Sequence, residues 1–153
     1  MRLWIAAAAA ALGSLPTVAL ACSCLATDDP TELKAFAAES AKDAVALVEV
    51  ETLVSYQESN GAGDRMRVVR TLAGAAEPEF RVERGPFPSS ASCDLLFERG
   101  QRAVVILYPS TKSTTDSTIY RISGLCTGLM LDKPVFRDAV AGAIGASQLA
   151  ERG

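Results

Sequence analysis

Apolar and polar residues alternate in several short segments of the chain, and this period is typical of β-strands with one buried face. Within one such segment, Val48 and Val50 alternate with Glu49 and Glu51. The alternating segments are residues 44–54, 65–72, 80–83 and 118–122. Residues 103–108 are apolar throughout, which predicts a central strand buried on both faces. Five short strands with helices at their periphery are typical of a small closed or partly open barrel.

Two helices are predicted, one before and one after these strands. Asp29 can cap a helix that begins at Pro30, and Glu32 has the spacing of a capping box. We expect this short helix to end near Ser40. A C-terminal helix is predicted to begin at residues 132–134, because apolar residues then recur at every fourth position: Phe136, Val140 and Ile144.

Residues 1–21 have the pattern of a secretory signal peptide. Arg2 precedes an Ala-rich apolar stretch that is too short to span a membrane, and residues 19–21 (Ala-Leu-Ala) form a small-x-small cleavage site. Cleavage after Ala21 would leave one domain, residues 22–153, that begins at Cys22. We therefore expect an exported protein, periplasmic or extracellular, without a transmembrane segment.

The composition argues against several classes of function. The chain has 15 basic and 18 acidic side chains, whereas nucleic-acid binders carry a basic face. Arg65, Arg67 and Arg70 could form a basic strip, but Asp64 and the negative net charge favour a solvated face. There is no histidine, which is the commonest general base and metal ligand, and there is no nucleophile-elbow or phosphate-loop motif. We predict that the protein is not an enzyme and uses no cofactor.

The four cysteines of an exported chain predict a disulfide framework. A bridge between Cys22 and Cys24 would close a very small ring, so each is expected to pair with Cys93 or Cys126. Two alternatives stay open. Cys22 could carry a lipid anchor, although Ala19 stands where lipoproteins prefer leucine. The cysteines could also bind a soft metal, although structural zinc sites have close cysteine pairs at both ends.

Three segments around the cysteines resemble the netrin-like (NTR) module: Cys22-Ser23-Cys24, Ser90-Ala91-Ser92-Cys93 and Gly124-Leu125-Cys126-Thr127. More specifically, they resemble the N-terminal domain of tissue inhibitors of metalloproteinases (TIMP-like) and its bacterial relatives. The resemblance covers about residues 22–131, and the C-terminal helix is expected to belong to the same domain. It implies a disulfide-stapled, mainly β OB-fold barrel of five strands flanked by helices, with the pairs Cys22–Cys93 and Cys24–Cys126.

The resemblance also implies a function. In inhibitors of this kind, the α-amino nitrogen and carbonyl oxygen of the first cysteine chelate the catalytic zinc of a metalloprotease. Cys22 would thus bind a partner's zinc in trans, and Ser23 would enter the adjacent specificity pocket. Cys24, Ala91 and Ser92 would complete the surface that contacts the partner. An α-amine with a pKa of about 7.7–8.0 is easily deprotonated at neutral pH, so this chemistry is reasonable.

The chain differs from the animal inhibitors in ways that concern its target. It lacks their third disulfide and their separate cysteine-rich C-terminal domain, and Asp94 follows Cys93 where they typically have glycine. Residues 25–27 also lack the proline that is often found there. Netrin-like modules also occur as binding domains, so a non-inhibitory extracytoplasmic protein-binding or structural domain is the alternative. The identity of the partner and the oligomeric state stay open.

Overall fold

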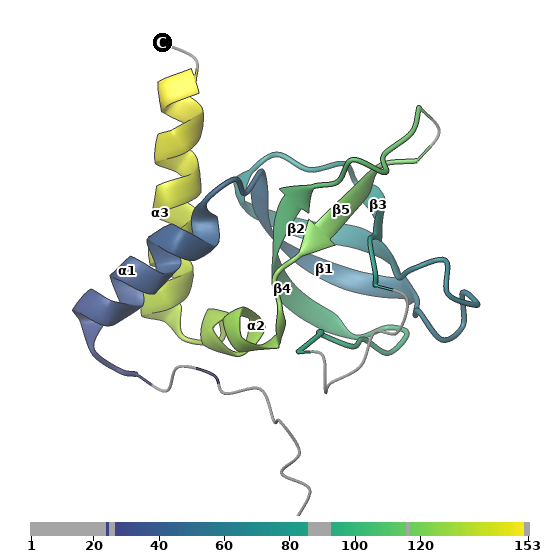
Figure 1. Cartoon of the computed structure of the whole chain (residues 1–153), viewed down its shortest axis with the longest axis horizontal. Helices are drawn as coiled ribbons and strands as arrows, with labels where there is room; N and C mark the ends of the chain where they lie inside the picture. Colours follow the sequence, from purple (N-terminus) through teal and green to yellow (C-terminus); the bar gives the residue numbers. More distant parts are fainter. Residues whose placement is uncertain (1–23, 25–26, 86–92, 116, 152–153) are drawn as a thin grey trace, which may run out of the picture.

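The structure, a computed structural model of the chain, describes residue 24 and residues 27–85, 93–115 and 117–151. A β-barrel occupies one side of the molecule and a group of helices the other (Figure 1). The elements, in chain order, are α1 (Pro30–Ala41), β1 (Ala46–Val54), β2 (Arg65–Gly74), β3 (Glu79–Val82), β4 (Arg102–Pro109), β5 (Ile119–Ile122), α2 (Leu125–Leu131) and α3 (Pro134–Glu151).

The five strands close into a barrel in the order β1-β2-β3-β5-β4, because β1 pairs with both β2 and β4. Four of the strand pairs are antiparallel, and β3 and β5 are parallel. This is the five-stranded OB-fold arrangement with flanking helices, as the sequence predicted. Closure gives every strand a neighbouring strand on both sides, so the barrel has no open edge with unpaired backbone groups.

The structure has one helix that the sequence pattern did not predict. Helix α2 has seven residues, its N-cap Gly124 supplies no side-chain hydrogen bond, and Gly128 lies within it. It therefore lacks the local signals by which a helix is recognised. Met130 and Leu131 are buried with side chains of α1 and α3, which indicates that tertiary packing stabilises α2.

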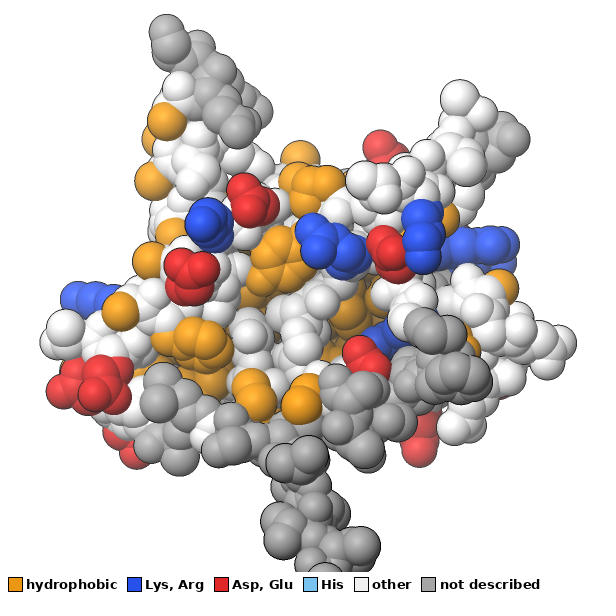
Figure 2. Space-filling model, in the orientation of Figure 1, with side chains coloured by type: hydrophobic (Ala, Val, Ile, Leu, Met, Phe, Trp, Pro, Cys, Tyr) orange, Lys and Arg blue, Asp and Glu red, His pale blue; other side chains and the backbone are white. Residues whose placement is uncertain are grey.

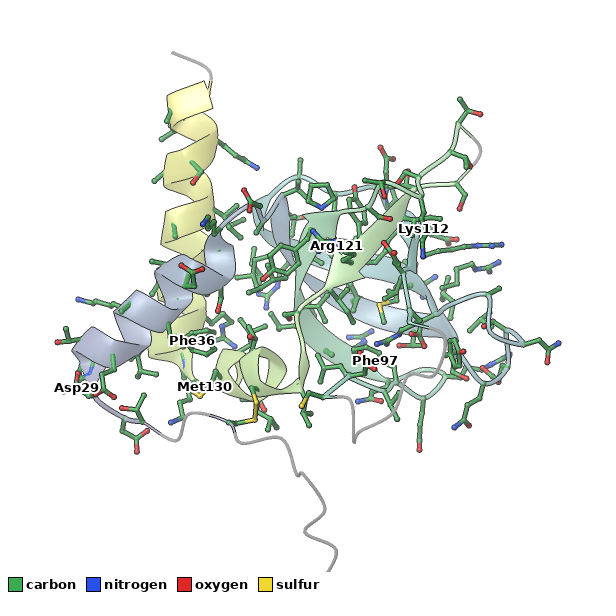
Figure 3. The ribbon with its side chains drawn as sticks, in the orientation of Figure 1. Asp29, Phe36, Phe97, Lys112, Arg121 and Met130 are labelled. Carbon is green, nitrogen blue, oxygen red and sulfur yellow. A yellow bond between two sulfur atoms is a disulfide. The ribbon has the colours of Figure 1, made fainter. Side chains whose placement is uncertain are left out.

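Two hydrophobic cores hold the fold together. The first fills the barrel, and its members include Met66, Phe80, Val105 and Leu107. The second lies between the barrel and the helices, and its members include Leu33, Leu47, Ile106, Phe136 and Ile144. Strand β4 supplies Val105 and Leu107 to the first core and Ile106 to the second, which confirms that residues 103–108 are buried on both faces. Phe36 of α1 and Met130 of α2 both belong to the helix side (Figure 3).

Helix α1 begins as predicted, with one difference in its cap. The Asp29 carboxylate accepts hydrogen bonds from the backbone N–H groups of Thr31 (2.8 Å) and Glu32 (3.0 Å). The Glu32 carboxylate does not close a capping box on Asp29; it accepts the Thr27 hydroxyl at 2.6 Å. The Asp29 N–H instead donates to the Thr27 oxygen at 3.1 Å. Thr27 therefore joins the cap to the segment that precedes the helix.

The outer face of β1 and β2 is a solvated face with paired charges. Arg67 forms an ion pair with Glu51 at 3.1 Å, and Arg70 forms one with Glu49 at 3.2 Å. Both arginine side chains are more than half exposed, so each pair contributes at most about 1 kcal/mol. Arg67 and Arg70 are thus matched by carboxylates, and this favours the solvated face over the polyanion-binding strip.

Candidate partner-binding surface

A disulfide connects the N-terminal segment to α2. Cys24 and Cys126 form it across 102 residues of sequence, with their Cα atoms 5.0 Å apart. Cys126 lies in the first turn of α2, so the bridge places Cys24 beside this helix. This pairing is the one that the resemblance implied. The other four residues expected to contact a partner lie outside the described residues: Cys22, Ser23, Ala91 and Ser92.

Cys93 lies directly beside this bridge and is itself in a disulfide. Its carbonyl oxygen accepts a hydrogen bond from the N–H of Leu125 at 2.8 Å. A Cβ atom on Gly124 would be 3.2 Å from that oxygen, so the glycine permits the close approach. We call Cys24, Cys93 and Cys126 the cysteine cluster. It brings together three segments that are far apart in the sequence, and Cys22, the expected partner of Cys93, lies outside the described residues.

A lysine provides a second anchor for the N-terminal segment. The Lys133 ammonium group donates to the Thr27 carbonyl oxygen at 2.9 Å and to Asp28 Oδ1 at 2.5 Å. This hydrogen bond, with the attraction of the ammonium charge, lowers the pKa of Asp28. The segment between Cys24 and α1 is thus anchored by the disulfide at Cys24, by the Lys133 contacts at Thr27 and Asp28, and by the cap of α1. A segment held at several points loses little conformational freedom when it binds a partner.

A buried ion pair holds the chain just before residues 86–92. Arg84 Nε donates to Asp64 Oδ2 at 2.7 Å, and the two side chains are only 4% and 1% exposed. Arg84 Nη2 lies 2.6 Å from the same oxygen, but its direction does not allow a hydrogen bond. The other carboxylate oxygen accepts the N–H of Tyr56 at 2.8 Å, and the guanidinium lies 5.5 Å from the centre of the Phe97 ring. Residues on both sides of the 86–92 segment are therefore packed together.

Sequence reasoning did not identify Arg84. It stands in a polar stretch after β3, where an arginine is usually exposed, and Asp64 belongs to a glycine-rich turn. No local pattern relates the two residues, because they meet only when the barrel closes.

Two exposed leucines, Leu96 and Leu129, follow Cys93 and Cys126 by three positions in the sequence. Leu95 packs against α2 so closely that a Cβ on Gly128 would be 2.7 Å from its Cδ1. The next residue in each segment, Leu96 and Leu129, is 46% and 54% exposed. Exposed apolar side chains beside a fixed N-terminal segment are suitable for contact with a protein partner.

A cavity of about 540 Å³ opens beside the cluster, and we call it the α1–β5 cavity. Figure 2 shows the surface hollowed between α1 and the barrel. Asp94 and Thr127, which directly follow Cys93 and Cys126, line it. Tyr108 also lines it and donates its hydroxyl hydrogen to the Ser40 carbonyl oxygen at 2.5 Å. Burial raises the pKa of Tyr108, although the charge of Arg121 partly opposes this shift.

The described ranges contain no group of three or more His, Cys, Asp or Glu side chains placed to hold a metal ion. Among the helices of those ranges, none is long and apolar enough to cross a membrane. Comparisons of the chain with protein-family models, with curated proteins and with solved structures found no match.

Proposed function

We propose that the protein is an exported inhibitor of a zinc metallopeptidase that chelates the catalytic zinc through the α-amine and carbonyl oxygen of Cys22. The observation that carries the proposal is the cysteine cluster. The Cys24–Cys126 bridge anchors the chain two residues after Cys22, and Cys93 lies against the same turn of α2. The residues expected to contact a partner flank these fixed points in the sequence, Ser23 beside Cys24 and Ser92 beside Cys93.

The chemistry requires an N-terminus that is free and held in place. A catalytic zinc keeps an open position, where it activates the water that attacks the peptide bond. A neutral α-amine that occupies this position displaces the water. Inhibition should therefore weaken as the pH falls below about 7.7, because the protonated amine cannot coordinate a metal. The anchors at Cys24, Thr27 and Asp28 would reduce the entropy lost on binding.

The test compares the mature protein that begins at Cys22 with a form that carries one extra alanine before it. The parent should inhibit at least one member of a zinc-peptidase panel, and the extension should raise the inhibition constant at least about 100-fold, because the α-amine is displaced from the zinc. A form with an alanine added after Gly153 is the control of equal mass. The proposal fails if the parent inhibits none of the panel or if the extended form inhibits equally well.

Exposed Leu96 and Leu129 favour a second candidate, a protein-binding domain that inhibits nothing. In that case a partner that binds the parent should also bind the extended form, and a Leu129→Ser variant should bind it more weakly. The intact mass of the exported protein, measured without reduction, separates both candidates from a lipoprotein. A mass increased by acyl groups would mean that the Cys22 amine is blocked.

A further inference from the structure

Charged side chains of both signs line the α1–β5 cavity, and the cations lie on the side formed by the barrel. Glu83 accepts a hydrogen bond from the Ser110 hydroxyl at 2.6 Å and forms an ion pair with Lys112 at 2.9 Å. These contacts, together with the nearby charge of Arg121, lower the pKa of Glu83. One carboxylate thus faces two cations, and Figure 3 shows Lys112 and Arg121 on the same side of the barrel. Among the described residues, no carboxylate lies within ion-pair distance of Arg121.

Arg121 keeps hydrogen-bonding capacity that the protein does not use. Its Nε donates to the Pro109 carbonyl oxygen at 3.1 Å, and its guanidinium lies 6.0 Å from the centre of the Tyr108 ring. A guanidinium has five N–H donors, and its outer pair can bind both oxygens of a carboxylate. Arg121 therefore lies at the cavity wall beside Tyr108, with donors left for a ligand.

A buried hydroxyl lies in the same cavity. Ser123 is 5% exposed and lines the cavity, and in the described part of the chain its Oγ has no hydrogen-bond partner. Ser123 follows Arg121 by two residues, and Arg121 lies opposite Tyr108 in the β4–β5 register, so the three residues belong to one face. A buried hydroxyl without a partner costs free energy, which a bound ligand would recover.

The side of the cavity formed by α1 has the opposite charge. Glu39 lines it from α1, with no ion-pair partner among the described residues, and Asp94 lines it beside the cysteine cluster. A ligand that bound only through negative charge would be repelled there. A ligand with an amino or hydroxyl group could donate a hydrogen bond to the Glu39 carboxylate. The cavity, at about 540 Å³, has the size of a small-molecule site.

We propose that the α1–β5 cavity binds a small amino acid or hydroxy acid. Its carboxylate lies between the Arg121 guanidinium and the Ser123 hydroxyl, and its amino or hydroxyl group faces Glu39. This site is distinct from the zinc-chelating N-terminus and does not depend on it.

The test uses a panel of free L-amino acids together with lactate, malate and tartrate. Ligand-detected NMR would identify binders, and calorimetry would measure their affinity. At least one acid should bind with a Kd of about 1 mM or lower. Its carboxamide should bind at least about ten-fold more weakly, because the neutral amide loses the charged contact with Arg121.

Two variants and one matched control locate the site. Arg121→Gln should weaken binding at least about ten-fold, and Ser123→Ala should weaken it about five-fold. Arg65→Gln, an exposed arginine without an ion pair in the described residues, should leave the affinity unchanged. The inference is overturned if no acid binds at about 10 mM, if the carboxamide binds equally well, or if both cavity variants bind like the parent.

The same acid should bind equally well to the form with an extra alanine before Cys22. The two proposals are therefore tested separately. Loss of peptidase inhibition in that form would not contradict ligand binding in the cavity, and absence of ligand binding would not contradict the inhibition proposal.

Discussion

Asp64 and Arg84 form the most deeply buried ion pair among the described residues. Both side chains are almost completely buried, and each compensates the charge of the other. The Asp64 carboxylate also accepts a backbone N–H, so its removal would disturb the turn before β2 as well. Burial makes such a pair costly to break even where its net contribution to stability is small.

Asp64→Asn should therefore lower the free energy of unfolding by about 3–5 kcal/mol, because it leaves the Arg84 charge buried without a counter-ion. Urea denaturation would measure the loss. Glu51→Gln, which removes ion pairs with the exposed Arg67 and Arg102, is the matched control and should cost about 1 kcal/mol or less. Equal losses in the two variants would contradict the structural role of the buried pair.

At the level of elements, the start of α1 and the segment before it are stabilised both by local hydrogen bonds and by contacts with a residue far away in the sequence. The Asp29 cap is local, whereas the Lys133 contacts join this segment to the start of α3. The pKa of Asp28 is lowered in the folded protein. The ion pair therefore stabilises the fold at pH values above the ordinary carboxyl pKa of 3.8, and its contribution disappears as the pH falls through the lower pKa of the folded state.

Lys133→Met should be less stable than the parent at neutral pH, and the difference in the free energy of unfolding should shrink as the pH is lowered below 3.8. Thermal or urea unfolding at a series of pH values would measure it. Lys42→Met removes an exposed lysine that has no ion pair among the described residues, so its difference from the parent should not vary with pH in this way. A difference for Lys133→Met that is constant with pH would exclude the Asp28 ion pair as its cause.

At the level of the whole molecule, the Cys24–Cys126 bridge joins the segment before α1 to α2, the helix that follows the last strand of the barrel. Its 102-residue separation gives it a large effect on the unfolded chain, whose freedom it restricts. Among the described residues, neither hydrophobic core has a cysteine as a member, so the bridge is not itself part of the core packing.

Replacement of Cys24 and Cys126 together by serine should lower the free energy of unfolding by about 2–5 kcal/mol and leave the barrel folded. Circular dichroism would test the fold, and denaturation under non-reducing conditions would give the stability. On the proposed function, the same variant should also lose inhibition of a zinc peptidase to a greater extent than its lower stability explains, because Cys24 no longer anchors the chain to α2. Inhibition at the parent's level would show that this anchor is not needed.

Local patterns determined much of the fold. The predicted strand segments match β1 to β5 to within two residues at each end, because alternation of apolar and polar side chains follows from the geometry of a half-buried strand. The Asp29 cap and the start of α3 were also recognised locally. The C-terminal apolar repeat places Phe136, Val140 and Ile144 in the core as predicted.

Only the tertiary structure decided the features that depend on distant residues. Helix α2 has no cap or amphipathic repeat of its own and forms against α1 and α3. The Arg84–Asp64 pair, the cavity with Ser123, and the position of Cys93 beside Cys24 and Cys126 exist because closure of the barrel brings separate segments together. The sequence pattern of a segment indicates only whether that segment is helical or extended and which of its faces is buried. These sites arise where several segments pack together, so the pattern of one segment does not show which residues of the others it will meet.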